Sequence, residues 1–232
     1  MNLSILEKLI GISFRDKNLL KQALTHRSYL NEDRAWPVGH NERLEFLGDA
    51  VLELVVSDFL FKRYPNKPEG QLTEYRSALV NVQSNMASAN SLRLNEFILT
   101  SRGESKDIGR ARQIILSDAY EAVIGALYLD QGFEAVQQLI AKLVLSKAND
   151  IVANYFQRNT KSRLQEMTQK FLQVAPTYQV LDESGPAHDK QFIVGVFFGS
   201  DLIAKGTGPT KQHAEEEAAK VALQLKGWLA IA

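Results

Sequence analysis

Apolar residues recur at spacings of three and four between about residue 3 and residue 155, and this periodicity limits the possible folds more than any other feature. Such spacing gathers apolar side chains on one face of an α-helix. The pattern is interrupted at Gly11, at 65–70 and at 103–109, where glycine or proline is found. It continues unbroken through LTEYRSALVNVQSNMASANSL (72–92). We therefore predict an all-helical domain of several packed helices over residues 1–156.

The sequence changes character after Tyr155. Polar residues at 157–161 predict a linker, and short apolar segments separated by turn residues follow it. The order of elements is that of a small α-β-β-β-α domain over residues 162–228. Its expected elements are a helix at 162–171, strands at 177–183, 192–198 and 202–207, and a final helix at 211–226. The whole chain is thus predicted to be mostly α, with two domains.

Composition adds only broad limits. The chain has no cysteine, which excludes disulfides and thiolate metal sites and favours a reducing cytoplasm. No apolar run approaches the roughly 18 residues that span a bilayer, and the first residues lack a secretory signal pattern, so no membrane partner is expected. Net charge is +0, with 18 Lys and Arg against 19 Asp and Glu in residues 1–157 and 9 against 8 in the remainder. Any binding of nucleic acid must therefore depend on local patches.

Two segments place carboxylates on one helical face. In HNERLEFLGDAVLELVVSDFL, Glu42, Glu45 and Asp49 fall at i, i+3 and i+7. Asp118 and Glu121 repeat the i, i+3 spacing within ILSDAYEAVIGALYLD, whose other residues are mostly apolar. If the two helices pack side by side, four of these carboxylates meet at one point.

Such a cluster suits a divalent cation. Carboxylates held close together repel one another, which raises some of their pKa values and costs stability. Oxygen ligands favour Mg²⁺, which commonly binds through a few acids together with substrate phosphates. One or two such ions could activate water and neutralise charge that develops on a phosphodiester.

Plainer readings compete with this one. Acids at i, i+3 are more often a solvated helix face, paired with nearby arginines. Gly48, in the middle of the acidic helix, costs roughly 1 kcal/mol relative to alanine, and it marks close approach of a ligand or simply tight helix packing. Phe46, between the acids, is most simply a core residue. The four histidines lack the spacing of metal ligands. The glycine-containing stretches at 103–109 and 206–208 do not match a Walker loop, so no nucleotide cofactor is expected.

The motif HNERLEFLGDAVL (40–52) resembles the signature of the ribonuclease III family. Other blocks of that family are similar to ALTHRSY (23–29), to Glu69-Gly70 before LTEYRSALVN, and to SDAYEAVIGALYLD (117–130). The resemblance covers essentially the whole chain, and the blocks occur in the same order as in the family. A helical nuclease domain followed by a double-stranded RNA-binding domain is the arrangement of the bacterial form.

This resemblance implies roles for the acids. Glu45, Asp49, Asp118 and Glu121 match the metal-binding catalytic acids of the family, and Glu42 matches a supporting acid at the cleavage site. Glu69 matches an acid that handles RNA. Phe46 matches an aromatic residue that packs across a homodimer, which the family uses to cut both strands of a duplex.

The C-terminal domain resembles the double-stranded RNA-binding fold, which reads A-form shape through 2′-hydroxyls and phosphates. Thr210 is predicted to be the N-cap of the final helix. The N-terminus of that helix would offer backbone NH groups and the positive end of the helix dipole to a phosphate. The usual basic cluster is reduced here to one reliably charged residue, Lys211, which indicates weaker phosphate binding. The residues that match RNA contacts are Gln165, Glu166, His188, Lys211, Gln212 and His213.

The implied protein is a homodimeric, Mg²⁺-dependent endonuclease for double-stranded RNA, in which Mn²⁺ substitutes. Its products carry 5′-phosphate and 3′-hydroxyl ends, and its substrates are structured precursor RNAs such as rRNA. One rival is a non-catalytic RNA-binding protein on the same fold. A second rival is a metal phosphohydrolase for small phosphate esters, which the C-terminal domain disfavours.

Overall fold

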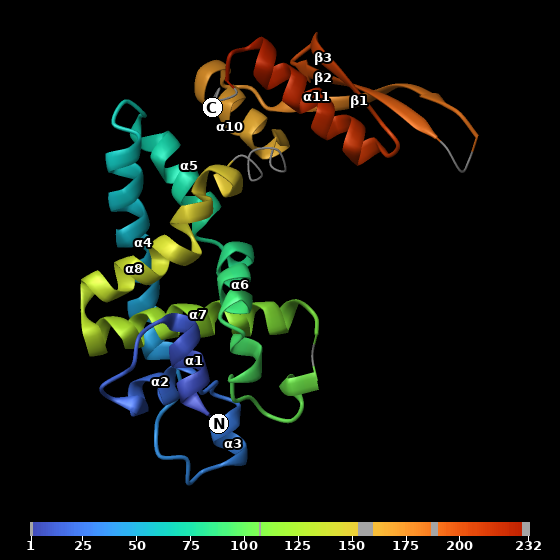
Figure 1. The fold of residues 1–232 in the computed structure, drawn as a ribbon. Helices are drawn as coiled ribbons and strands as arrows, with labels where there is room; N and C mark the ends of the chain where they lie inside the picture. The colour runs from blue at the N-terminus through green and yellow to red at the C-terminus, as the bar shows by residue number, and fades with distance from the viewer. Residues whose placement is uncertain (1, 107, 153–159, 187–189, 229–232) are drawn as a thin grey trace. The chain divides into compact units, whose positions relative to one another are not determined.

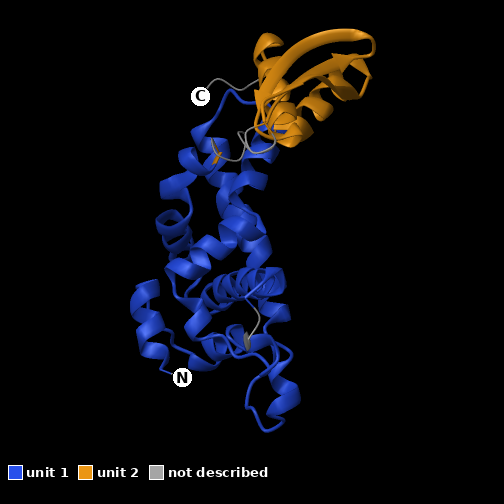
Figure 2. Ribbon diagram, turned by 90° about the vertical axis from the view of Figure 1, so that its right-hand side faces the viewer, with its two compact units in different colours: residues 1–151 blue, residues 152–232 orange. Residues whose placement is uncertain are grey.

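The computed structural model describes residues 2–106, 108–152, 160–186 and 190–228. It divides the chain into two compact units, Met1–Ile151 and Val152–Ala232 (Figure 2). Unit 1 is helical and unit 2 combines two helices with a three-stranded sheet, so the predicted fold class is confirmed.

Two 22-residue helices, α4 and α7, pack against each other at the centre of unit 1. Helices α2, α6 and α8 also pack against α7, and α4 and α6 both cross it in Figure 1. Most of the middle of α7 is buried, and the fully buried Tyr120 and Ile124 belong to it. The helices of unit 1 are α1 (Leu3–Ile10), α2 (Lys17–Ala23), α3 (Tyr29–Glu32), α4 (Glu42–Arg63), α5 (Glu69–Leu79), α6 (Val82–Ser91), α7 (Arg110–Gln131) and α8 (Phe133–Leu143), with 3₁₀ turns η1 (Leu94–Glu96), η2 (Glu104–Lys106) and η3 (Leu145–Lys147).

The unbroken periodicity over 72–92 proves to be two helices. Helix α5 ends at Leu79, and Asn81 begins α6 by accepting a hydrogen bond from the amide of Ser84 at 3.0 Å. The Asn81 side-chain amide also donates to the carbonyl oxygens of Ser77 (2.8 Å) and Ala78 (2.9 Å) at the end of α5. A single asparagine thus closes one helix and caps the next, because its side chain satisfies backbone groups at both ends.

Unit 2 folds around an antiparallel sheet of order β1-β2-β3. Helices α10 and α11 pack against each other, α10 contacts β1, and α11 contacts β2 and β3. Gly206 permits the contact with α11, since a Cβ there would lie 2.1 Å from the Ala218 nitrogen. The elements are α10 (Thr160–Leu172), β1 (Pro176–Ser184), β2 (Gln191–Phe198), β3 (Asp201–Gly208) and α11 (Lys211–Leu225). The core comprises Leu164, Val196, Phe198, Ala204, Ala218, Ala219, Ala222 and Leu223.

The predicted elements of unit 2 agree with the observed ones to within two residues at each end. The predicted linker at 157–161 needs correction, because its last two residues are the first two of α10. Thr160 is buried, and its hydroxyl donates a hydrogen bond to the carbonyl oxygen of Glu216 at 3.1 Å. The rest of that linker, 157–159, lies outside the described residues. None of the helices in the described part of the chain is both long and apolar enough to span a membrane.

Candidate active site

The crossing of α4 over α7 is built on two glycines. A Cβ on Gly48 would lie 1.8 Å from the carbonyl oxygen of Glu121, and a Cβ on Gly125 would lie 2.2 Å from that of Leu44. Any other residue at either position would push the two backbones apart. Of the two readings of Gly48, tight helix packing is therefore the observed one. The same packing brings the acidic faces of the two helices together.

Three of the predicted acids meet at this crossing. One oxygen each from Glu45, Asp118 and Glu121 can be chosen so that all three lie within 4.8 Å of one another, and each side chain is partly buried. Asp49, one turn beyond Glu45 on α4, is exposed and lies outside this group of three. Its charge still acts on Glu45 and Glu121. We call Glu45, Asp118 and Glu121 the acid cluster.

The acid cluster carries an electrostatic conflict. Burial raises the pKa of Glu121 to about 8, and the charges of Asp49, Asp118 and Glu45 add to this shift. The pKa of Glu45 is raised by burial and then by Asp118, Glu42 and Asp49. Burial also raises the pKa of Asp118, with His26 opposing it. A divalent cation would relieve this repulsion, and an all-oxygen donor set is the kind that Mg²⁺ prefers.

A cavity of about 390 Å³ opens beside the acid cluster. It is lined by acids from both helices and by groups from two loops. The residues around it are His26, Arg27, Asn41, Glu42, Glu45, Glu104, Ala111, Ile114, Ile115 and Asp118. This is the space in which a cation and part of a substrate could lie beside Glu45 and Asp118.

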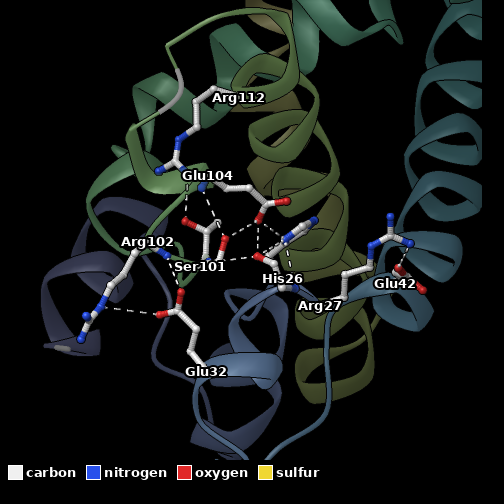
Figure 3. Close-up of polar contacts among 10 residues, drawn as sticks. His26, Arg27, Glu32, Glu42, Ser101, Arg102, Glu104 and Arg112 are labelled. Atoms are coloured by element: carbon white, nitrogen blue, oxygen red, sulfur yellow. Dashed lines mark hydrogen bonds and ion pairs between the residues drawn. The ribbon is translucent and has the colours of Figure 1, made fainter.

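Glu104 and His26 on this wall belong to a polar network that joins the two loops (Figure 3). The Nδ1 atom of His26 lies 3.1 Å from Oε2 of Glu104 and 2.9 Å from Oγ of Ser28. The Ser28 hydroxyl donates to Glu104 and accepts from the amide of Ser101 at 2.9 Å. The network fixes the loop that carries Glu104 against the segment that carries His26.

Glu42, at the start of α4, stands between two basic side chains. Its Oε1 lies 3.4 Å from Nη1 of Arg27, and its Oε2 lies 3.7 Å from Nδ1 of His40 (the Arg27 pair is drawn in Figure 3). Glu42 is half exposed and lines the cavity without joining the acid cluster. The supporting role of Glu42 stays a prediction.

Three residues near the site had no predicted role. His26 belongs to ALTHRSY (23–29), one of the blocks that resemble the family. Glu104 belongs to the stretch 103–109, which does not match a Walker loop and carries no predicted role. Asn85, on α6, donates through Nδ2 to Oε1 of Glu121 at 2.6 Å. The only signal for Asn85 in the sequence is a polar residue within an otherwise helical apolar pattern, which does not reveal its partner.

The two remaining predicted residues of unit 1 lie apart from the acid cluster. Glu69 begins α5, is exposed, and accepts a hydrogen bond from the Thr73 hydroxyl at 2.9 Å; it does not line the cavity. Phe46 is 81% exposed, so the simple reading of it as a core residue of this chain is wrong. It borders a groove of about 620 Å³ whose apolar lining includes Leu47 and Leu129.

In unit 2 the described residues predicted to contact RNA are exposed. Gln165 and Glu166 lie on α10, and Lys211 and Gln212 lie with His213 in the first turn of α11. Thr210 caps α11 as predicted, since its side chain accepts a hydrogen bond from the His213 amide at 3.1 Å. His188 lies outside the described residues.

Comparison with known proteins agrees with this arrangement. Residues 16–148 match the family model described as ribonuclease-III-like, and residues 160–226 match the double-stranded RNA binding motif. The chain belongs to the ribonuclease III family. Proteins named Ribonuclease 3 are similar to nearly the whole of it. That of Streptococcus pneumoniae (strain P1031) is 45% identical over 223 residues, 95% of each chain, and that of Geobacillus sp. (strain WCH70) is 45% identical over 219 residues, 94% of this chain and 89% of the relative.

A solved structure is similar to unit 1 alone. The nuclease domain of ribonuclease III from Campylobacter jejuni aligns with 46% sequence identity and a TM-score of 0.57, over 62% of this chain and 97% of that chain. Its title refers to structural flexibility in a region involved in dimer formation. The helical fold around α4 and α7 is therefore that of a ribonuclease III nuclease domain.

Proposed function

We propose that this chain is an endonuclease that cuts double-stranded RNA with the help of Mg²⁺ bound at the acid cluster. The observation that carries the proposal is the meeting of Glu45, Asp118 and Glu121 within 4.8 Å at the wall of a cavity. Membership of the ribonuclease III family and the RNA-binding motif of unit 2 supply the substrate class.

The residues present fit a divalent cation. Burial raises the pKa of all three carboxylates, and neighbouring acids raise the pKa of Glu45 and Glu121 further. A cation shared by the three would offset the repulsion between them. Glu45, Asp118 and Glu121 would be ligands, and the exposed Asp49 would contribute from the rim. When bound, such an ion supplies an activated water and offsets negative charge on the phosphodiester. Mn²⁺ has the same ligand preferences and is expected to substitute.

The chain itself positions the substrate. The Gly48–Gly125 crossing fixes the spacing of the acids, because the two backbones are in contact there. Arg27 at the cavity offers a cationic group to a phosphate, and its exposed side chain lies 3.4 Å from Glu42. We expect Glu42 to orient Arg27 in this way, and Glu69 to contact RNA away from the cluster.

Unit 2 holds the duplex. We infer that Gln165 and Glu166 on α10 contact the minor groove, with His188 as a second contact. Lys211, Gln212 and His213 are expected to reach a phosphate at the N-terminus of α11, where the backbone amides point outward. By analogy with the family, we infer products with 5′-phosphate and 3′-hydroxyl ends, and structured precursor RNAs such as rRNA as substrates. We also propose a cytoplasmic location.

A homodimer completes the assignment. Phe46 leaves 81% of its surface exposed. It lies beside an apolar groove, so a two-fold related copy could place its own Phe46 there and receive the first in return. Two acid clusters would then serve the two strands of one duplex.

Cleavage of a long RNA duplex by the purified chain tests the proposal. We expect cleavage with Mg²⁺, none with EDTA, and a loss of at least about 1,000-fold in rate for Glu121→Gln at unchanged duplex binding. Glu134→Gln is the matched control, because Glu134 is an exposed acid on α8 that does not line the cavity.

Two outcomes would contradict the proposed activity, and a third would contradict the role assigned to Glu121. Duplex binding without metal-dependent cleavage would favour the non-catalytic RNA-binding alternative. Turnover of a small phosphate ester without preference for duplex RNA would favour the phosphohydrolase alternative. A loss of binding together with cleavage in Glu121→Gln would assign that carboxylate a structural role.

A further inference from the structure

Asn85 is a buried polar residue whose side chain faces the acid cluster. It lies on α6 with 2% of its surface exposed. Its Nδ2 atom donates to Oε1 of Glu121 at 2.6 Å, a short hydrogen bond between a neutral donor and a carboxylate. The amide nitrogen of Asn85 is the atom that faces Glu121, and an ionised carboxylate accepts its hydrogen bond.

Stability alone does not account for this asparagine. Its Oδ1 atom is buried and has no hydrogen-bond partner among the described residues. A buried polar atom without a partner is destabilising, by roughly 1–3 kcal/mol. An apolar side chain would avoid that cost at the interface between α6 and α7. The residue is explained if its amide serves the carboxylate.

The helix that carries Asn85 is fixed in place. Asn81, one turn earlier, caps α6 and ties it to the end of α5 through two hydrogen bonds from its side chain. The backbone amide of Asn85 donates a hydrogen bond to the carbonyl oxygen of Asn81 at 2.9 Å. The donor therefore reaches Glu121 from a helix whose start is tied to the end of α5.

The hydrogen bond from Asn85 constrains the carboxylate of Glu121. It occupies one carboxylate oxygen, which leaves the second oxygen for a cation and restricts the rotation of the carboxylate plane. Partners of this kind, which orient a metal ligand without touching the metal, commonly change metal affinity by about 10- to 100-fold.

We propose that Asn85 is a positioning residue that holds the Glu121 carboxylate in the orientation needed to bind the divalent cation. The inference rests on the proposed metal site. It predicts that removal of the Asn85 side-chain amide lowers the affinity for the metal. Cleavage should then fall because less metal is bound.

Mn²⁺ binding by the metal-free full-length chain, measured by isothermal titration calorimetry, tests the inference. Asn85→Leu keeps the branched shape of the side chain and removes the donor, and we expect it to raise the Kd for Mn²⁺ by about tenfold or more. The Mg²⁺ concentration for half-maximal cleavage should rise in parallel, excess metal should restore much of kcat, and metal-free duplex binding should stay unchanged. Asn85→Ala repeats the test if leucine perturbs folding.

Ser88→Ala is the matched control, since Ser88 is a buried polar residue one turn further along α6. A Kd for Mn²⁺ within about twofold of the unaltered chain in both Asn85 variants would overturn the inference, as would an equal change in Ser88→Ala. Failure of the proposed function looks different, because the unaltered chain would then bind no Mn²⁺ or Glu121→Gln would bind it normally.

Discussion

Unit 1 and unit 2 each present groups suited to a polynucleotide backbone, but they place them differently. In unit 1 three carboxylates are half-buried within 4.8 Å of one another, between helices whose backbones touch. In unit 2 Lys211, Gln212 and His213 stand exposed in the first turn of α11, and only the Thr210 cap organises the backbone beneath them.

The difference follows from what each region has to do. Groups that stabilise charge during a reaction act best when they are fixed and shielded from water, even if they repel one another beforehand. Groups that grip phosphate act additively through long-range attraction, and each of them contributes a modest amount. The acid cluster should therefore respond sharply to small changes in backbone geometry, whereas the start of α11 should respond gradually.

The largest effect is expected from Gly48→Ala. The new Cβ would lie 1.8 Å from the carbonyl oxygen of Glu121, so α4 and α7 must separate. We expect a loss of at least about 3 kcal/mol in the free energy of unfolding and no detectable cleavage, because the acids move apart with the helices. Chemical denaturation and the duplex cleavage assay measure the two effects.

Gly70→Ala is the control for this variant, because Gly70 is also helical and a Cβ there meets no atom within 4 Å. It should leave stability unchanged or raise it by up to about 1 kcal/mol, since alanine favours helix. Equal behaviour of the two variants would mean that the close crossing does not hold the acid cluster together.

Much of unit 1 could be predicted from the sequence, because helical periodicity and the spacing of acids are local properties. The positions of Glu45, Asp118 and Glu121 on facing helices required one further assumption, that the two helices pack side by side. Gly48 carried that information, although the sequence did not name Gly125 as its counterpart. The glycine pair is a contact between segments 77 positions apart, which no local pattern contains.

The errors have a common cause. The helix break at Asn81 depends on a capping geometry that competes with an apolar pattern running straight through it. Phe46 is exposed although it is a large apolar residue, and its sequence pattern does not distinguish a core position from an exposed one. Asn85 and Glu104 contribute through partners 36 and 76 positions away, Glu121 and Ser28. In unit 2 the strands and Thr210 were placed well because alternation and capping are again local.

The electrostatic conflict of unit 1 predicts a pH dependence of stability in metal-free protein. The pKa of Glu121 is about 8 in the folded chain, against about 4.3 for an unfolded glutamate. Between these values the folded chain holds a proton that the unfolded chain releases, so the stability contribution of this group falls as pH rises from about 5 to 8. Glutamine at this position does not titrate.

Calorimetric unfolding in EDTA at pH 5, 6.5 and 8 measures this effect. Glu121→Gln should gain stability relative to the unaltered chain across the window, with a Tm difference that levels off above about pH 8. Added Mn²⁺ at pH 8 should raise the Tm of the unaltered chain and leave Glu121→Gln nearly unchanged. A Tm difference that is constant with pH would show that Glu121 is not destabilised by its neighbours.

The smallest effect is expected at the start of α11. Lys211→Ala removes one exposed cation from a helix N-terminus whose backbone amides and Thr210 cap remain in place. Duplex binding should weaken several-fold at moderate salt, and the slope of log K against log salt should become shallower by about one unit or less. Lys220→Ala, on the same helix with its ammonium 3.3 Å from Glu217, is the matched control and should change neither quantity. Metal-dependent cleavage at saturating RNA should persist in both variants, because the acid cluster is untouched. A collapse of binding in Lys211→Ala would contradict the additive behaviour assigned to unit 2, and would make this single lysine as critical to its unit as Gly48 is to the other.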